Sequence, residues 1–149
     1  MAQTTAEIGY GIKFKRGDGA ETEVFTELGE LIDITPPALA TDDIDASHHG
    51  SPNAGKEYIA GMIEPGEIAL TIVHVPGDAA NTQLNSDQLD RQSRNWQIEY
   101  VKGGNTVVDT YYGYVKSNTP TTPLNDRMTS EVVIKVAKLD PQRTITPVA

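Results

Sequence analysis

The chain has 149 residues, no cysteine and a formal net charge of −9. This length suffices for one domain with its own hydrophobic core, and the absence of cysteine excludes disulfides and thiolate metal sites. The acidic excess argues against specific DNA or RNA binding, which normally requires a basic surface. The longest apolar run, Ile68 to Val75, is too short to span a membrane, and residues 1–7 lack the charged and apolar regions of a secretory signal. We therefore expect a soluble protein without a membrane association.

Alternating apolar residues, separated by turn residues, predict a series of short strands along the chain. The expected strands cover residues 9–15, 21–25, 28–34, 66–75, 95–102, 106–116 and 130–138. A single helix is expected over residues 78–93, with Asn85 and Gln88 at capping-box spacing. Its apolar residues, Leu84 and Leu89, would give it a narrow buried stripe. The pattern predicts a mainly β domain, an antiparallel β-sandwich or partly open barrel with one flanking α-helix.

A long polar connection, residues 40–65, separates two of the expected strands. It is longer than the usual connection in a compact domain, yet it includes apolar residues such as Ile44 and Tyr58, which disordered segments largely lack. We therefore expect an extended inter-strand loop that docks on another surface. Residues 1–149 are expected to form one domain, with residues 1–11 and 139–149 as extended N- and C-terminal arms.

The same connection holds the best candidates for chemistry. Asp42, Asp43, Asp45, His48 and His49 are of the residue types that bind divalent metals. Adjacent histidines on an extended chain point to opposite sides, however, and the spacing matches no helical metal motif. The chain also lacks a nucleophile elbow, a P-loop and a dinucleotide fingerprint. We favour a hydrogen-bonding polar loop over a metal site, and we expect no cofactor and no enzymatic activity.

Four segments occur in an order that is typical of one family. They are Phe25 to Glu30, Ile34 to Pro37, Asp43 to Ser51 and Tyr58 to Glu67. A strand pair with a glycine turn, a proline-containing linker and a final Val/Ile/Lys strand follow after Asn95. In this order the chain resembles the major tail tube proteins of long, non-contractile-tailed bacteriophages. The doubled His48-His49 departs from the family pattern, in which an acidic or polar residue is more usual.

The resemblance implies a structural virion protein that forms hexameric rings. The rings would stack into the tube through which DNA leaves the virion, a plan shared with gene-transfer-particle and type VI secretion tubes. The implied partners are other copies of the chain and the tail tape-measure, tail-tip and tail-terminator proteins, with DNA passing through without specific binding. The implied location is the virion tail, after assembly in the host bacterial cytoplasm.

The resemblance also implies roles for two sets of residues. Residues 43–58 would be disordered or mobile in the free subunit and would become ordered against the neighbouring ring. The expected inter-ring stacking residues are Asp43, Asp45, Ser47, His48, His49, Ser51, Lys56 and Tyr58. The lumen candidates are the polar strand positions Glu67, Thr71, Gln97 and Glu99. Independently of the resemblance, a ring of joined sheets would satisfy edge strands, and an acidic surface repels DNA phosphate.

Two other hypotheses remain open at this point. A non-enzymatic β-sandwich module for binding or virion decoration would use the long loop for a ligand, and it would stay a monomer or small oligomer. A metal-dependent enzyme centred on His48 and His49 would retain zinc or manganese through purification.

Overall fold

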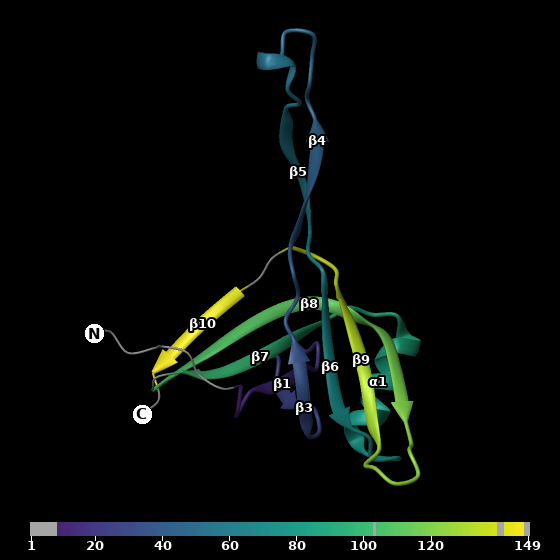
Figure 1. Cartoon of the computed structure of the whole chain (residues 1–149). Helices are drawn as coiled ribbons and strands as arrows, with labels where there is room; N and C mark the ends of the chain where they lie inside the picture. Colours follow the sequence, from purple (N-terminus) through teal and green to yellow (C-terminus); the bar gives the residue numbers. More distant parts are fainter. Residues whose placement is uncertain (1–8, 103, 140–141, 148–149) are drawn as a thin grey trace, which may run out of the picture.

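The computed structural model describes residues 9–102, 104–139 and 142–147. β-Strands dominate the described residues, and Figure 1 labels them in chain order. The strands are β1 (Lys13–Gly17), β2 (Phe25–Glu27), β3 (Leu31–Thr35), β4 (Ala40–Asp45), β5 (Tyr58–Glu64), β6 (Glu67–Val73), β7 (Arg94–Lys102), β8 (Asn105–Thr121), β9 (Thr129–Val136) and β10 (Gln142–Pro147). One α-helix, α1 (Ala79–Asp90), and a short 3-10 helix at Pro52–Ala54 complete the regular structure of this part of the chain.

Eight strands form one antiparallel sheet in the order β2-β1-β7-β8-β9-β6-β3, with β10 paired to β8 beside this path. The long strand β8 joins the two halves of the sheet. Its first residues pair with β7 on one side and β10 on the other, and its last residues pair with β9. The prediction of a mainly β, antiparallel fold with one helix is confirmed, and the sheet is not closed into a barrel.

The hydrophobic core lies on one face of this sheet. On β6 the alternation places Ile68, Leu70 and Ile72 inside, and the register sets the first two opposite Ile134 and Val132 of β9. Successive residues of a strand point to opposite faces, so the residues between them lie on the other face. The core is therefore one-sided, and the sheet keeps a second, largely polar face.

Trp96 and Phe14 form the aromatic part of the core. Both side chains are fully buried, and their rings stack with centroids 5.6 Å apart. The indole N–H of Trp96 donates to the carbonyl oxygen of Gly113 over 3.0 Å, which satisfies the only polar atom of that side chain. These contacts join β1, β7 and β8 beneath the helix.

Helix α1 covers the core face, with Leu84 fully buried in the core. The predicted cap at Asn85 is wrong, because Asn85 lies inside the helix. Asp78 is the N-cap, and its carboxylate accepts a hydrogen bond from the N–H of Ala79 over 2.7 Å. Leu89 is 82% exposed, so Leu84 is the only one of the two leucines that the helix buries. Within the described ranges, no helix is long and apolar enough to cross a membrane.

Several strand boundaries differ from the prediction. The strand expected at 9–15 begins at Lys13, and the strand expected at 21–25 is β2, at 25–27. The latter shift has a local cause, since the carboxylate of Asp18 accepts hydrogen bonds from the N–H groups of Ala20 and Val24 and holds the residues between the strands as a loop.

The two expected arms fall partly outside the described residues. Residues 1–8 of the N-terminal arm and residues 140–141 and 148–149 of the C-terminal arm are not described. Residues 142–147 form β10, which the two flanking prolines did not suggest. Pro147 is compatible with this strand because it lies at its end, on an edge of the sheet.

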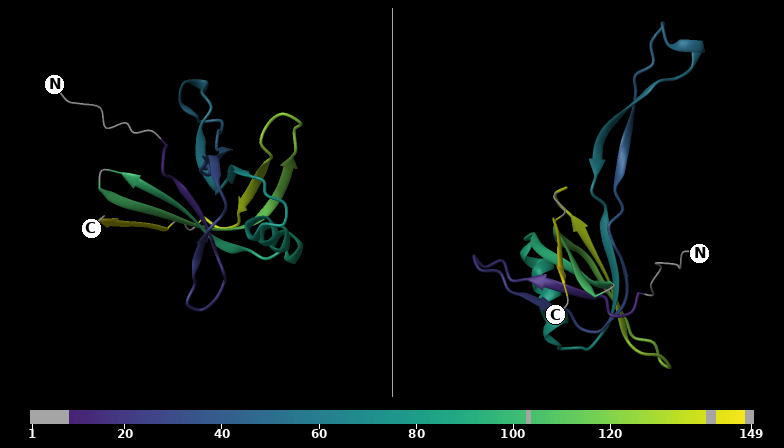
Figure 2. Two further views of the ribbon diagram at one scale, coloured as in Figure 1. Left: turned by 90° about the horizontal axis from the view of Figure 1, so that it is seen from below. Right: turned by 90° about the vertical axis from the view of Figure 1, so that its left-hand side faces the viewer.

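The long connection between β3 and β6 is a β-hairpin. β4 and β5 pair only with each other and project far from the sheet, as Figure 1 and the right-hand view of Figure 2 show. Every residue of β4 is exposed, so the strand has no buried face and no alternation of apolar and polar residues. This explains why the sequence pattern predicted an irregular loop here.

Candidate assembly site

The projecting hairpin β4–β5 carries all of the residues expected to mediate stacking. Its two strands are joined by residues 46–57, and Ser47 organises the point where the strands end. The Ser47 hydroxyl oxygen accepts a hydrogen bond from the N–H of Glu57 over 2.8 Å, and its own N–H donates to Asp45 over 2.9 Å. The Ser47 hydroxyl and, after it, the Ser47 N–H lower the pKa of the Asp45 carboxyl.

A cluster at the hairpin tip is centred on Glu57. The Ser51 hydroxyl donates to Glu57 Oε2 over 2.8 Å, and His48 Nε2 lies 3.2 Å from the same oxygen. The N–H of Gly50 donates to His48 Nδ1 over 3.1 Å, so Nδ1 is the acceptor and Nε2 carries the proton toward Glu57. Ser47, His48 and Ser51 are thus brought together, and Glu57 is the partner that sequence reasoning missed.

The two faces of the hairpin differ in chemistry. One face presents Ile44 and Ile59, which pair directly in the register and are 48% and 56% exposed. The opposite face includes Asp43, Asp45 and Tyr58, and beyond a register shift it includes Ile63, which pairs with Thr41. His49 and Lys56 are exposed near the tip. A hairpin that leaves two paired isoleucines open to water on one side is typical of a surface that another protein covers.

The metal candidates are not assembled into a site. Among the residues that the structure describes, no group of three or more histidine and carboxylate side chains is arranged to hold a metal ion. Both ring nitrogens of His48 are engaged within the tip, by Gly50 and Glu57. The register places the side chains of Asp43 and Asp45 beside Ala60 and Tyr58.

The four lumen candidates lie on one face of the large sheet, opposite the core. Glu67 and Thr71 alternate with the buried residues of β6, and Gln97 and Glu99 alternate with those of β7. Pairing across β8 and β9 keeps the two pairs on the same side. The structure therefore brings these residues onto a common surface, which is called the polar face below.

Lysines neutralise much of the acidic charge on the polar face. Lys116 Nζ lies 2.5 Å from the carboxylate of Glu67, and Lys15 Nζ lies 2.9 Å from that of Glu99. The hydrogen bond from Lys116 lowers the pKa of Glu67. The amide of Gln97 lies 3.4 Å from the hydroxyl of Thr110. The face is polar and mixed in charge rather than uniformly acidic.

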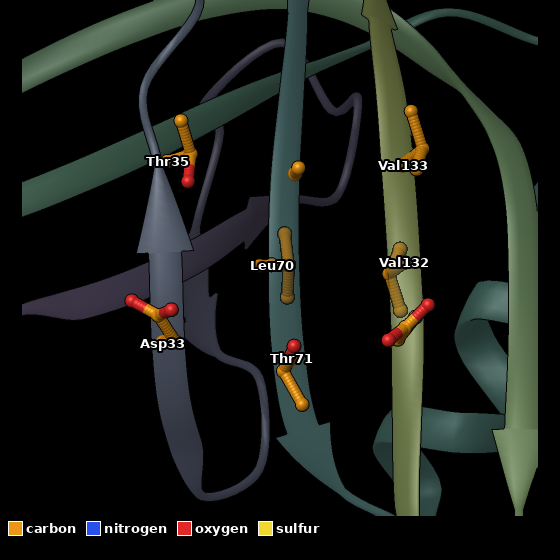
Figure 3. Close-up of a pocket in the computed structure, with 8 residues that line it drawn as sticks. Asp33, Thr35, Leu70, Thr71, Val132 and Val133 are labelled. Carbon is orange, nitrogen blue, oxygen red and sulfur yellow. The ribbon is translucent and has the colours of Figure 1, made fainter.

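A shallow hollow with a volume of about 250 Å³ opens on the polar face. Figure 3 shows Asp33, Thr35, Thr71 and Val133 around it. Its cause is Ala69, which the register places between Thr35 and Val133, so that a methyl group stands where its neighbours have longer side chains. The polar face is thus indented between β3 and β9.

The fold resembles solved tail and injection-system structures. The tail of an empty gene transfer agent particle matches with a TM-score of 0.70 at 15% identity, over 97% of this chain and 100% of that chain. An extracellular contractile injection system, solved as its sheath/tube terminator in the extended state, matches with a TM-score of 0.70 at 14% identity, over 96% and 99%. The SPP1 tail tube matches with a TM-score of 0.64 at 11% identity, over 93% and 78%. At these identities the likeness is one of fold.

Sequence comparison identifies the family. No curated protein sequence matches the chain. The model of the lambda phage tail tube protein, TTP, matches residues 15–141, which include the hairpin and all of the large sheet except β10 and the first two residues of β1. The chain belongs to the lambda phage tail tube protein family.

Proposed function

We propose that copies of this structural tail tube subunit close into hexameric rings, and that the rings stack into a tube that conducts DNA out of the particle. The observation that carries the proposal is the hairpin, which projects the half-exposed pair Ile44 and Ile59 away from the only core of the described chain. Burying such side chains contributes on the order of 1 kcal/mol each. A neighbouring copy that covers the isoleucine face would supply this energy at every contact along the tube.

Ring closure is assigned to the free edges of the sheet. β2 and β3 are the outer strands of the sheet order, and each has one edge without a partner strand in the described chain. Unpaired edges invite further strand pairing. Head-to-tail pairing of one copy with the next closes a ring when the rotation per copy fits, and the axial hairpin then links one ring to another.

The polar face is assigned to the lumen of the tube. Helix α1 and the core occupy the other side of the sheet, so the polar face is the side on which the sheet itself is uncovered. Its acidic groups are paired with lysines at Glu67 and Glu99. Such a surface offers DNA no basic patch on which to bind, and the chain as a whole carries a charge of −9, which repels phosphate.

The proposal includes partners and a location. A tape-measure protein would lie along the polar face during assembly, and tail-tip and terminator proteins would contact the two ends of the tube. The subunit would be assembled in the cytoplasm of the host bacterium and would remain in the virion tail, without catalytic activity. Structures of a tail, a sheath/tube terminator and a tube-terminating cap share this fold, which supports these roles.

The test combines electron microscopy with light scattering on the purified, concentrated chain. The wild-type protein is expected to form hollow rings or tubes, alone or on a tail-tip initiation complex. A variant with Ile44→Ser and Ile59→Ser should stay folded but fail to stack, because it removes the apolar face of the hairpin. Deletion of residues 47–56 should have the same effect.

The matched control is Leu89→Ser, which removes a similar side chain that is 82% exposed on α1. This variant should assemble like the wild type, since the helix lies on the side away from the lumen and the hairpin. Normal tubes from the isoleucine variant would remove the hairpin from the mechanism. A wild-type chain that stays monomeric even on the initiation complex would favour a binding or decoration module instead.

A further inference from the structure

Strand β10 is held to the sheet without contributing to the core. It pairs in antiparallel register with residues 105–110 of β8, at the outer edge of the molecule in Figure 1. Residues 143–147 are all exposed, including Ile145 at 61%. β9, which pairs with the other half of β8, buries Val132, Ile134 and Val136. The contacts of β10 are therefore main-chain hydrogen bonds and one ion pair.

That ion pair satisfies a buried carboxylate. Asp109 of β8 is 5% exposed, and Arg143 of β10 donates to both of its oxygens, from Nε to Oδ1 over 2.7 Å and from Nη2 to Oδ2 over 3.0 Å. Tyr100 and Tyr111 pack against the core, and burial together with the nearby Asp109 carboxylate raises the pKa of both side chains. Among the described residues, Arg143 alone forms an ion pair with Asp109.

Any strand that pairs with this edge of β8 must therefore provide a partner for the Asp109 carboxylate. A carboxylate buried without a cation is strongly unfavourable, so a strand that replaces β10 must bring a cation opposite Asp109. Residues 142–147 of another copy meet this requirement with the same register and the same arginine. Their fit within one chain demonstrates that the same segment fits this edge sterically.

We propose that β10 is exchanged between copies on assembly, so that β10 of one copy pairs with β8 of its neighbour and Arg143 binds the neighbour's Asp109. The inference rests on the proposed tube, because it concerns adjacent copies within it. When two copies exchange an identical strand, main-chain hydrogen bonds connect them. The contacts are those already made within one copy, so no new complementary surface is needed. The exchange leaves the core strands of both copies in place, so no core residue of either copy is exposed.

Disulfide trapping tests the exchange directly, because the wild-type chain has no cysteine. Val108 and Thr144 lie directly opposite each other in the β8–β10 register. One chain carries only Val108→Cys and a second carries only Thr144→Cys, so neither can close a disulfide within itself. The two are mixed in equal amounts, assembled and oxidised, and dimers are identified by the mass of the peptide joined through residues 108 and 144.

The expected result is this dimer in assembled tubes and its absence from the dilute, unassembled mixture. A chain with both substitutions serves as the control, since it should close internally when free and so show that the geometry permits a disulfide. The neighbouring pair, Val107→Cys and Ile145→Cys, covers the alternative pair geometry of an antiparallel ladder. Tubes in which the single-cysteine chains stay monomeric, while the double-cysteine chain closes internally, would overturn the exchange.

Charge exchange provides a second measurement. The variants Arg143→Asp and Asp109→Arg should each reduce tube yield by about tenfold or more, because each leaves a buried charge unpaired. An equal mixture should recover tubes, since each chain then finds its complement only on the other. Recovery only when both changes are in one chain would show that β10 stays on its own copy. Absence of tubes from the wild-type chain, in contrast, would count against the proposed tube itself.

Discussion

The carboxylate of Asp87 in α1 receives two parallel hydrogen bonds from the guanidinium of Arg16 in β1. Arg16 Nε lies 2.5 Å from Oδ2 and Nη2 lies 2.6 Å from Oδ1. Arg94 of β7 adds a third bond, from Nε to Oδ1 over 2.8 Å. Asp87 is 1% exposed, and its hydrogen bond raises the pKa of Arg16. This carboxylate fastens the helix to two strands of the sheet.

Asp87→Ala is expected to lower the free energy of unfolding by about 3–5 kcal/mol, because it leaves two guanidinium groups largely buried without an anion. Urea denaturation followed by circular dichroism measures the change. Asp90→Ala, at an exposed position of the same helix, is the control and should stay within about 0.5 kcal/mol of the wild type. Equal losses in the two variants would show that the ion pairs contribute little.

The helix could be predicted from the sequence, whereas the ion pair between Asp87 and Arg16 that holds it to the sheet could not. The Pro-Gly turn and the Asp78 that follows it are local sequence signals for the start of a helix. Leu84 then provides the buried contact between the helix and the core. Asp87 and Arg16 are 71 residues apart in the chain. Only the fold brings them together, so the alternation of apolar residues holds no information about their contact.

The N-cap of α1 gives a second prediction. Asp78→Ala should destabilise the protein by about 1 kcal/mol, because it removes the acceptor of the Ala79 N–H. Asn85→Ala should be close to neutral or slightly stabilising, since alanine has the higher propensity inside a helix. Thermal unfolding of both variants measures the difference. The opposite order would mean that the helix begins later than Asp78.

Only some features of the hairpin could be predicted from the sequence. Its place in the chain, its unusual length and its isoleucines were visible in the sequence. Its strand pairing was not, because β4 is rich in aspartate, which is uncommon in strands, and has no buried face. The role of Glu57 at the tip was also hidden, because it depends on the turn that brings His48 and Ser51 to it.

The base of the hairpin gives a third prediction. Gly66 has φ of +83°, and a Cβ there would lie 2.3 Å from the carbonyl oxygen of Ala38 on the opposite side of the base. Gly77 has a similar φ of +80°, with open space around it. Gly66→Ala should therefore cost at least about 1 kcal/mol more than Gly77→Ala in urea denaturation. Similar costs would show that the two chains at the base can move apart freely.

The side of the sheet on which the four polar residues lie could be predicted from the sequence, whereas their role in a lumen stays a prediction. Alternation along β6 and β7 correctly placed Glu67, Thr71, Gln97 and Glu99 opposite the core, since a strand has a strict period of two. The lysines beside them could not be inferred, because β8 and β1 bring them there through cross-strand register. Sequence charge alone therefore suggested a more acidic face than the structure has.

The ion pair between Glu67 and Lys116 gives a prediction for pH dependence. The hydrogen bond from Lys116 lowers the pKa of Glu67 from its ordinary value of 4.5. The folded state then binds fewer protons on this group than the unfolded state at mildly acidic pH. The contribution of the pair to stability is therefore present above about pH 4.5 and is lost as the pH falls through the lowered, folded-state pKa.

A double-mutant cycle with Glu67→Gln and Lys116→Gln isolates this contribution from the rest of the protein. Unfolding free energies of the four proteins are measured by urea denaturation at about pH 7 and again at about pH 3. We expect a stabilising coupling between the two side chains at the higher pH and a weaker one at the lower, since Glu67 loses its attraction for the ammonium group as it becomes protonated. A coupling of equal size at both pH values would mean that the hydrogen bond does not depend on the charge of Glu67. The ion pair would then contribute nothing to the dependence of stability on pH.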